Sequence, residues 1–401
     1  MRREQWHHAV VNLAAHPVAW TFQNALRRLG PMRHVPGLGL VISGAECGRD
    51  VLLRDKEFPK NGPGGFAAVI TQVLGPHALT NMDGAAHRAL RSKLSDVLSP
   101  ANVDALIQRA CVPAIERLRA ELVAGGTVDL VSFMDTLSGG ITCEMMGVAP
   151  AAADVAAVHR EIARRGARIS KAIGLRPLSA RKLALVLADC DWLWELARPN
   201  YERAAEATLI GRLRTAGLSF DEARGVLLMI FLGGTLTTAA ALPRLIGLLV
   251  DSGQLATLRR DPSLASMTVD EGLRFLTPVP ATTRITHGDT HVAGLPVRAG
   301  TRVIILTGNL ARDASLFPDP DRFDITRTHD PRAKHLWYGS GPHFCFGFPL
   351  AQRELRLVIE LFATLPAPVR IVRRRPAWGA VVPAYASMRV RLDRAQAGAT
   401  P

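Results

Sequence analysis

The stretch Tyr338–Gly347 reads YGSGPHFCFG and places one cysteine, Cys345, among three glycines and a histidine. It directly precedes FPLAQRELRLVIELFATL, a run with the apolar spacing of a helix. Glycines at 339, 341 and 347 give the backbone freedom for tight turns. Amides at a helix N-terminus stabilise negative charge. Because a thiolate is a soft metal ligand, this loop predicts a metal-binding cysteine.

The other four cysteines have no motif around them and are expected to be buried, small apolar side chains; they are Cys47, Cys111, Cys143 and Cys190. Five cysteines without regular spacing argue against a disulfide framework and favour a reducing compartment, here the cytoplasm. The N-terminal stretch MRREQWHHAV lacks the apolar core of a signal peptide.

The chain has 401 residues, of which 48% are hydrophobic, and no linker-like stretch or internal repeat divides it. We expect a single domain over residues 1–401, with flexible tails at about 1–15 and 394–401. Helical periodicity dominates, for example after Ser99-Pro100 and from Asp221 onward. Strand-like pieces lie near residue 40, from 283 to 306 and near the end. The expected fold class is mainly α with a small β portion.

One apolar segment, residues 225–242, carries no charge and just reaches the length of a membrane span. Pro243-Arg244 directly follows it and interrupts the apolar run, which continues as LIGLLV, and three threonines lie within the segment, so a buried core helix is favoured. The net charge of +14 comes from dispersed arginines, with only 5% aromatic residues. This pattern favours a solvated basic surface or an acidic protein partner. We therefore expect no membrane and no nucleic acid as partners.

Two further motifs precede the cysteine loop. EGLR at 271–274 places Glu271 and Arg274 on one face of a short helix that must end before Pro278. PDPDRF at 318–323 adds Arg322 in a proline-rich loop. A Glu/Arg pair alone is usually a surface ion pair. Its order and spacing relative to Cys345 give it more weight here.

Together these stretches resemble the cytochrome P450 family, specifically its soluble bacterial branch, over nearly the whole chain. The loop matches the family's haem-binding pattern Phe-x-x-Gly-x-His/Arg-x-Cys-x-Gly, with Tyr338 in the aromatic position. The resemblance implies the family's triangular fold around a buried haem b, with Cys345 as the axial thiolate ligand of the iron. It also implies that Glu271, Arg274 and Arg322 form a structural ion network behind the haem loop.

The same resemblance assigns cationic partners to the haem propionates. In DGAAHRALR at 83–91, His87 and Arg91 lie one helical turn apart, although each alone would be read as a solvated helix residue. PVPATTR at 278–284 ends in Arg284, and His343 is the fourth donor. Two buried carboxylates would thus be paired, as buried charge requires. The remaining haem contacts that the resemblance implies are Gly234, Thr237, Tyr338, Gly339, Cys345 and Gly347.

GGTLTT at 233–238 is similar to the family's oxygen-activating stretch, normally Ala/Gly-Gly-x-Asp/Glu-Thr-Thr/Ser. Thr237 takes the alcohol position, and Thr237 and Cys345 are the expected catalytic residues. Threonine hydroxyls can bond back to carbonyls one turn earlier and bend the helix. Leu236 occupies the acid position and cannot relay protons. Protons must then pass through Thr237, water, substrate or another side chain; alternatively, Leu236 simply packs the substrate pocket.

The implied activity is that of a haem-thiolate monooxygenase in secondary metabolism. It would insert one oxygen atom of O2 into a small or mid-sized hydrophobic, natural-product-like substrate. The sequence contains no flavin or nicotinamide fingerprint, so electrons ultimately from NAD(P)H should arrive through a separate ferredoxin and ferredoxin reductase. By family position, the expected substrate contacts are Val69, Leu232, Leu236, Val279, Ala281 and Val382.

Two alternatives remain open at this point. Leu236 is the reason to keep a peroxide-driven or atypical haem-thiolate oxidation, such as coupling or desaturation. A haem-binding sensor or redox-silent scaffold is the non-enzymatic alternative, which a thiolate pocket with Thr237 makes less favoured.

Overall fold

The computed structural model describes residues 2–62, 66–151, 153–172 and 178–393. The helices, in chain order, are α1 (Arg3–Ala15), α2 (Pro17–Arg27), α3 (Ala45–Leu53), α4 (Phe66–Leu74), α5 (Gly84–Lys93), α6 (Pro100–Val123), α7 (Leu130–Met146), α8 (Val155–Ala172), α9 (Ala180–Glu202), α10 (Leu209–Thr215), α11 (Phe220–Asp251), α12 (Gln254–Arg260), α13 (Ala265–Leu276), α14 (Thr307–Leu310) and α15 (Phe348–Thr364). Short 3-10 helices are η1 (Leu79–Asn81), η2 (Pro262–Leu264), η3 (Leu336–Tyr338) and η4 (Gly341–His343).

The strands are short and form three small sheets. They are β1 (Met32–Val35), β2 (Gly39–Ile42), β3 (Val128–Asp129), β4 (Thr282–Ile285), β5 (Thr290–Val292), β6 (Leu295–Val297), β7 (Arg302–Ile305), β8 (Val369–Pro376) and β9 (Tyr385–Leu392). The sheet orders are β1-β2-β7-β4, β3-β9-β8 and β5-β6. Only the β2–β7 pair is parallel among these described strands, with Leu40 opposite Val303. The prediction of a mainly α fold with a small β portion is confirmed.

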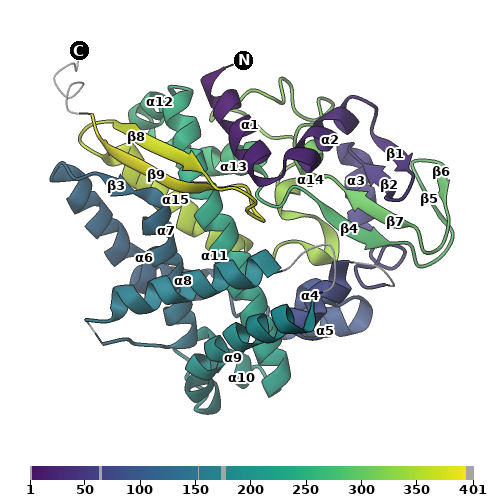
Figure 1. Ribbon diagram of the computed structural model, residues 1–401, viewed down its shortest axis with the longest axis horizontal. Helices are drawn as coiled ribbons and strands as arrows, with labels where there is room; N and C mark the ends of the chain where they lie inside the picture. Colours follow the sequence, from purple (N-terminus) through teal and green to yellow (C-terminus); the bar gives the residue numbers. More distant parts are fainter. Residues whose placement is uncertain (1, 63–65, 152, 173–177, 394–401) are drawn as a thin grey trace.

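Helix α11 passes through the middle of the molecule (Figure 1). Helices α6–α10 fill one side of it, and the β1-β2-β7-β4 sheet lies on the opposite side. The yellow β8–β9 hairpin and helix α1 lie above these layers in the same view. Because α11 contacts α1, α7, α13, α15 and the β8–β9 hairpin, it joins elements from both ends of the chain. This contact pattern is why we propose one domain over residues 1–401.

The local sequence explains both the start and the burial of α11. Ser219 accepts from the Glu222 amide at 3.3 Å, and the Glu222 carboxylate accepts from the Ser219 amide at 2.8 Å, which is a capping box. The helix continues past Pro243 to Asp251. By length and composition α11 could cross a membrane, but 61% of its most apolar 18-residue window is buried in the fold. The predicted core helix therefore agrees with the structure.

Two expectations about the chain ends need correction. Residues 3–15, expected to lie in a flexible tail, form α1, which buries His8, Val11 and Asn12 against the rest of the fold. Residues 394–401 lie outside the described part of the chain. Residues 373–376, which read RRRP, belong to strand β8, a strand that the sequence analysis did not predict and that pairs with β9.

Candidate functional site

The loop that carries Cys345 is shaped by two of its three glycines. Gly339 and Gly341 have φ of +85° and +66°, where side chains are strained. A Cβ at Gly341 would also lie 2.5 Å from the Leu52 carbonyl oxygen. Gly347 has φ of −80° and does not need glycine for its backbone. Its missing Cβ has no atom within 4 Å, so Gly347 leaves open space at the cavity.

The sulfur of Cys345 is buried beside hydrogen-bond donors. Burial raises the pKa of the thiol, whereas the Gly347 and Phe348 amides and the positive charge of Arg91 oppose that rise. The backbone amide of Cys345 donates to the Tyr338 carbonyl at 3.0 Å and fixes the loop. A bound metal cation would supply the counter-charge that such a buried thiolate requires.

A cavity of about 350 Å³ lies against Cys345. Its wall is built by segments that are far apart in the sequence, including α5, α11, β4, the cysteine loop and α15. The lining includes most of the residues that the sequence analysis assigned to the site: His87, Arg91, Gly234, Thr237, Val279, Arg284, Tyr338, Gly339, His343, Cys345 and Gly347. The structure therefore brings the expected thiol, threonine and cationic groups into one cavity.

The face of α11 that borders the cavity is formed by small and hydroxylated residues. Thr237 Oγ1 donates to the Gly233 carbonyl at 2.6 Å, and Thr238 Oγ1 donates to the Gly234 carbonyl at 2.8 Å. These bonds confirm the expected back-bonding to the preceding turn. Gly233 and Gly234 have no atom within 4 Å of a built Cβ, so this face of the helix leaves room for a flat ligand.

Most of the expected substrate contacts are not part of the cavity wall. Leu232 and Leu236 lie on the core side of α11, because they are four residues apart and their neighbours at 233, 234, 237 and 238 face the cavity. Ala281 and Val382 are also not lining residues. The side chain of Val69 lies outside the described part of the chain. Only Val279 of this set borders the cavity.

Two buried nitrogen atoms in the wall support a haem with carboxylate groups. His87 Nε2 and Arg284 Nε have no hydrogen-bond partner among the described residues. Burial lowers the pKa of Arg284 to about 10, so its guanidinium remains charged at neutral pH. Unpaired buried donors are costly, and an anionic ligand would satisfy them. Together with Cys345 and the open α11 face, these donors fit a haem.

His343, the fourth predicted propionate donor, borders the cavity and contacts Asp83. Its Nε2 lies 3.1 Å from Asp83 Oδ1, and burial lowers its pKa to about 4. A neutral imidazole that donates to Asp83 has only an acceptor left at Nδ1. Asp83 also accepts from the Lys60 and Asn61 amides at 3.0 and 2.7 Å. His343 and Asp83 therefore hold the loop next to the cavity.

Lys60 is a cavity residue that the sequence analysis missed. Its Nζ lies 3.3 Å from Thr80 Oγ1. Burial, followed by the positive charge of Arg284, lowers its pKa to about 7. A lysine in a Pro-Lys-Asn-Gly loop has no sequence signal of burial.

The ion network contains the predicted Glu271–Arg274 pair but a different third arginine. Arg274 Nε and Nη2 donate to the Glu271 carboxylate at 2.6 and 2.9 Å, and both side chains are 0% exposed. Arg327 Nε and His329 Nε2 lie 3.3 and 3.2 Å from the same carboxylate. Arg322, which the sequence analysis placed here, contributes its carbonyl oxygen to Arg274 instead.

The backbone explains why Arg322 points away from the network. Asp319 has φ of +47°, and the Arg322 amide donates to its carbonyl at 2.9 Å in a tight turn. The Arg322 side chain is 51% exposed and pairs with Asp324 at 3.4 Å. The assignment of the Arg322 side chain to the network is therefore wrong, and Arg327 takes that place.

Glu354 of α15 is a second residue that the sequence analysis missed. It borders the cavity and is 3% exposed, and its Oε1 has no partner among the described residues. Burial raises its pKa to about 8, against a hydrogen bond with Thr238 that lowers it. Leu350, Glu354 and Val358 follow one another at four-residue spacing, so Glu354 interrupts the buried stripe of an amphipathic helix. An acidic residue within an apolar stripe was therefore the sequence feature that could have revealed Glu354.

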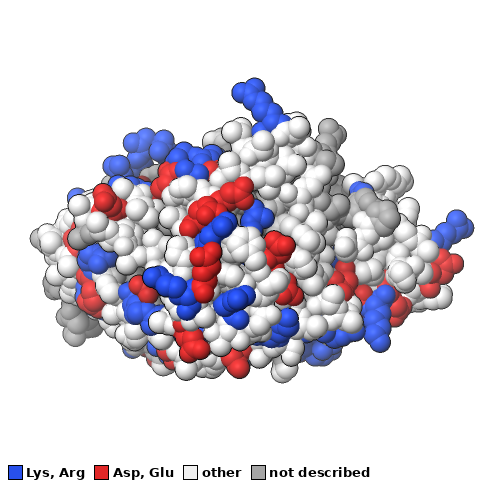
Figure 2. Space-filling view, turned by 90° about the horizontal axis from the view of Figure 1, so that it is seen from below, with Lys and Arg blue, Asp and Glu red and all other residues white. Residues whose placement is uncertain are grey.

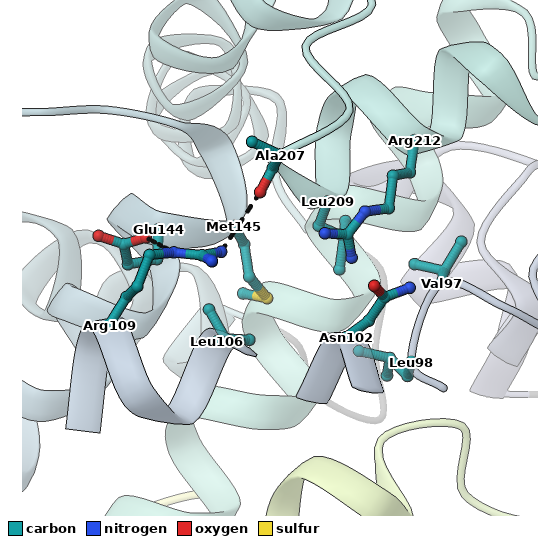
Figure 3. A pocket seen from close by; sticks show the side chains of 10 residues that line it. All are labelled: Val97, Leu98, Asn102, Leu106, Arg109, Glu144, Met145, Ala207, Leu209 and Arg212. Carbon is teal, nitrogen blue, oxygen red and sulfur yellow. Dashed lines mark hydrogen bonds and ion pairs between the residues drawn. The ribbon is translucent and has the colours of Figure 1, made fainter. Parts of the chain in front are cut away.

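A second, much smaller cavity of about 10 Å³ lies between α6, α7 and α10 (Figure 3). Arg109 crosses its edge, donating to Glu144 at 2.8 Å and to the Ala207 carbonyl at 3.3 Å. The volume corresponds to about one water molecule. Leu98 and Met145 line both cavities and therefore separate them.

Comparisons with known proteins agree with this site. The family model described as Cytochrome P450 matches residues 259–363, which include the Glu271–Arg274 pair and the cysteine loop. The chain is 30% identical over 308 residues to 6-deoxyerythronolide B hydroxylase of Saccharopolyspora erythraea, covering 72% of this chain and 71% of that protein. It is 28% identical over 297 residues to linalool 8-monooxygenase of Pseudomonas putida, covering 71% and 70%.

The fold is also found among solved structures. The crystal structure of P450BioI in complex with a hexadec-9Z-enoic acid ligated acyl carrier protein has a TM-score of 0.80 and 23% identity, covering 94% of this chain and 98% of that one. CalO2 has a TM-score of 0.79 and 22% identity, covering 94% and 96%. These structural similarities show a shared fold, and the sequence identity to the hydroxylase shows common ancestry. The chain is a member of the cytochrome P450 family.

Proposed function

We propose that this cytochrome P450 is a cytoplasmic monooxygenase that inserts one oxygen atom of O2 into a hydrophobic, natural-product-like substrate. Membership of the family supplies haem b, O2 and electrons derived from NAD(P)H. The observation that supports the proposal is that four of the predicted site residues border one cavity. Cys345 and Thr237 lie in the same wall as His87 and Arg284, whose Nε2 and Nε atoms have no partner among the described residues. A cavity built only to store a ligand does not require this combination.

Haem held by a thiolate supplies the oxygen-activating and oxidising chemistry when it is bound. Cys345 would hold its iron, and His87, Arg91 and Arg284 would hold its carboxylates. The hydroxyl of Thr237 can release its bond to the Gly233 carbonyl and direct a proton into the cavity. The apolar part of the wall excludes water and positions the substrate.

The substrate class follows from the apolar wall and from the relatives. Leu79, Ile141, Met145, Met229 and Leu273 border the cavity. The names of two relatives denote a hydroxylase of 6-deoxyerythronolide B and a monooxygenase of linalool, both acting on hydrophobic natural products. A small or mid-sized apolar substrate is the chemistry that this wall fits.

Electrons are proposed to come from a separate ferredoxin and its reductase. The net charge of +14 would attract an acidic carrier. On the face seen in Figure 2, basic and acidic side chains are interspersed, so that face offers no field of one sign. The steering of an acidic carrier would therefore have to come from another face.

The test compares two sources of oxidising equivalents for the same haem-loaded protein. In one reaction NAD(P)H, ferredoxin and ferredoxin reductase are supplied; in the other, hydrogen peroxide alone. Linalool and a set of macrolactones serve as probes, and oxidised products are identified by mass spectrometry. The proposal expects products that carry one atom from ¹⁸O2 in the ferredoxin reaction. Product formation only with peroxide would contradict it and support the peroxide-driven alternative that Leu236 motivates.

A further inference from the structure

The β8–β9 hairpin carries arginines along its solvent-facing side. Along β9, Met388, Val390 and Leu392 alternate with arginines and are buried in the core. The side that faces away from the core is called the arginine face and consists of Arg370, Arg373 and Arg375 of β8 and Arg389 and Arg391 of β9. The hairpin therefore presents an apolar side to the fold and a cationic side to solvent.

The strand register places like charges directly opposite one another. Arg373 pairs with Arg389, and Arg370 pairs with Arg391. Side chains that face each other in this way have Cβ atoms about 4.5 to 5.5 Å apart, and like charges there destabilise a sheet. Charged residues can protect an edge strand such as β8 from aggregation, but β9 lies between β3 and β8. Edge protection therefore does not explain the arginines of β9.

The described acids beside the hairpin do not neutralise the arginine face. Arg374, on the core side of the hairpin, pairs with Asp251 at 2.6 Å, whereas no arginine of the arginine face forms an ion pair with another described residue. Asp129 of β3 lies opposite Arg389, but its carboxylate accepts from two backbone amides and from the Ser387 hydroxyl. The arginine face therefore carries positive charge without a matching acid in the described part of the chain.

The same hairpin exposes an aromatic side chain. Trp378 lies in the turn between β8 and β9 and is 80% exposed. Tryptophan and arginine are among the residues that contribute most to the binding energy of protein interfaces. The sequence of the hairpin, residues 369–392, contains no Asn or Gln, the side chains that read adenine in DNA. This composition favours a protein partner over nucleic acid.

The arginine face is separate from the haem site. None of its arginines is among the described residues that border the cavity. Helix α15 begins just after the cysteine loop and has 17 residues, so it spans about 25 Å before the chain enters β8. An electron carrier has to approach the haem iron. A partner on the arginine face is therefore a different protein.

We propose that the arginine face is a docking surface for an acidic helix of a partner protein. Arginines two residues apart on a strand are separated by about 6.7 Å. Carboxylate side chains one turn apart on a helix have a similar spacing, about 5 to 6 Å between Cβ atoms. A helix with Glu or Asp at i and i+4 can therefore pair with successive arginines of one strand, and arginine binds carboxylates through two parallel hydrogen bonds. The bound carboxylates relieve the repulsion between opposing arginines. This role goes beyond the monooxygenase function and does not depend on it.

The binding test uses two labelled peptides of the same composition, one with glutamates at i and i+4 along one side of a helix and one with glutamates on all sides. Fluorescence anisotropy at about 150 mM salt gives the dissociation constants. The wild type should bind the one-sided peptide more tightly, and Arg373→Glu should weaken this binding by about 10-fold or more. Equal affinity for the two peptides in the wild type would overturn the proposal.

Arg298→Glu is the matched control. It changes the net charge by the same amount, and the exposed Arg298 follows β6, on the opposite side of the molecule from the β8–β9 hairpin (Figure 1). Its affinity for the one-sided peptide should remain close to that of the wild type. The same affinity in Arg298→Glu and Arg373→Glu would show that only net charge matters and would contradict a defined docking surface.

Stability separates docking from a structural role. Arg373→Glu converts the repulsive pair with Arg389 into a pair of opposite charges, so its urea midpoint should rise above those of the wild type and of Arg298→Glu. Arg373→Gln removes the repulsion without adding a charge and serves if Arg373→Glu folds poorly. Lower midpoints for both variants at 373 would show that Arg373 supports the fold, and the docking role would be wrong.

Two further measurements identify the class of partner. Duplex DNA that binds more tightly than the one-sided peptide, and loses this binding in Arg373→Glu, would assign the face to nucleic acid and overturn the proposal. NAD(P)H consumption with ferredoxin and reductase should be equal in Arg373→Glu and the wild type; a loss would assign the face to the electron carrier instead. If the wild type consumes no NAD(P)H, the monooxygenase proposal fails, while the peptide affinities still decide the docking proposal.

Discussion

Glu271 and Glu354 are buried to nearly the same degree, yet their surroundings give them opposite charge states. Glu271 is 0% exposed, and its carboxylate accepts from Arg274, Arg327 and His329; these partners outweigh burial and hold its pKa at about 2. Glu354 is 3% exposed and forms no ion pair with any described cation, so burial raises its pKa to about 8. Burial alone does not decide the ionisation of a carboxyl group; the charge of its neighbours does.

The two charge states imply different roles. An ionised carboxylate that contacts two arginines and a histidine is a structural tie between α13 and the loop that leads to the cysteine. A neutral acid beside the cavity can give up a proton without disturbing an ion pair. The comparison therefore predicts that the same substitution at the two positions will have different consequences.

The largest effect is expected from Glu271→Gln. This change leaves the buried Arg274 guanidinium without its carboxylate, and breaking a buried pair costs about 3 to 5 kcal/mol. We expect little haem-loaded protein and a much lower free energy of unfolding in urea. Glu354→Gln is the matched variant and should yield folded holoprotein. Similar haem content and stability in both variants would remove the distinction between the two carboxyl groups.

A smaller effect should identify the third arginine of the network. Arg327→Met removes contacts with Glu271 and with the Asp319 and Arg322 carbonyl oxygens, so a loss of about 1.5 to 3 kcal/mol is expected. Arg322→Met is the control, because its exposed side chain should matter by less than about 0.5 kcal/mol. Urea unfolding of both variants checks this. A larger loss for Arg322→Met would return that residue to the network.

Taken per pH unit, the smallest effect is the pH dependence of stability, which should have opposite signs at the two sites. The folded-state pKa of Glu354 lies near 8, above the ordinary value of 4.5. Its stabilising contribution is complete below pH 4.5 and is lost as pH rises toward 8, by at most about 1.4 kcal/mol per pH unit. Glu271, with a lowered pKa, contributes above pH 4.5 and loses that contribution as pH falls toward 2.

The measurement is the free energy of unfolding of wild type and Glu354→Gln between pH 5 and 8. Glu354→Gln cannot ionise, so its stability relative to wild type should increase steadily over this range. Parallel curves for the two proteins would show that Glu354 is already ionised in the fold or exposed to water.

The sequence was sufficient where a local pattern determines the structure. The glycines and cysteine of the 338–347 loop, the helix that begins near Asp221 and the Glu271–Arg274 spacing each specify a local geometry, and each is found. Thr237 back-bonding also follows from helix geometry alone.

Long-range packing decided the rest. Arg322 and Arg327 lie in the same loop, and only the turn at Asp319 selects the one that points inward. Lys60 is half-buried because it packs beside Thr80 of the distant η1 and Arg284 of β4. Leu236 lies four residues after Leu232 and therefore on the same side of α11. The sequence does not tell which side of α11 borders the cavity, so it could not show that both leucines face the core.

The central claim is that Cys345 holds the haem iron as a thiolate, and the most direct measurement is the absorption spectrum of the reduced protein with carbon monoxide. Cys345 alone among the five cysteines borders the cavity within the described residues. The wild type and Cys143→Ser should both give the Soret position specific to thiolate ligation, and Cys345→Ser should lose it together with activity. A histidine-type spectrum in fresh wild-type protein, or a thiolate spectrum that survives in Cys345→Ser, would contradict the account.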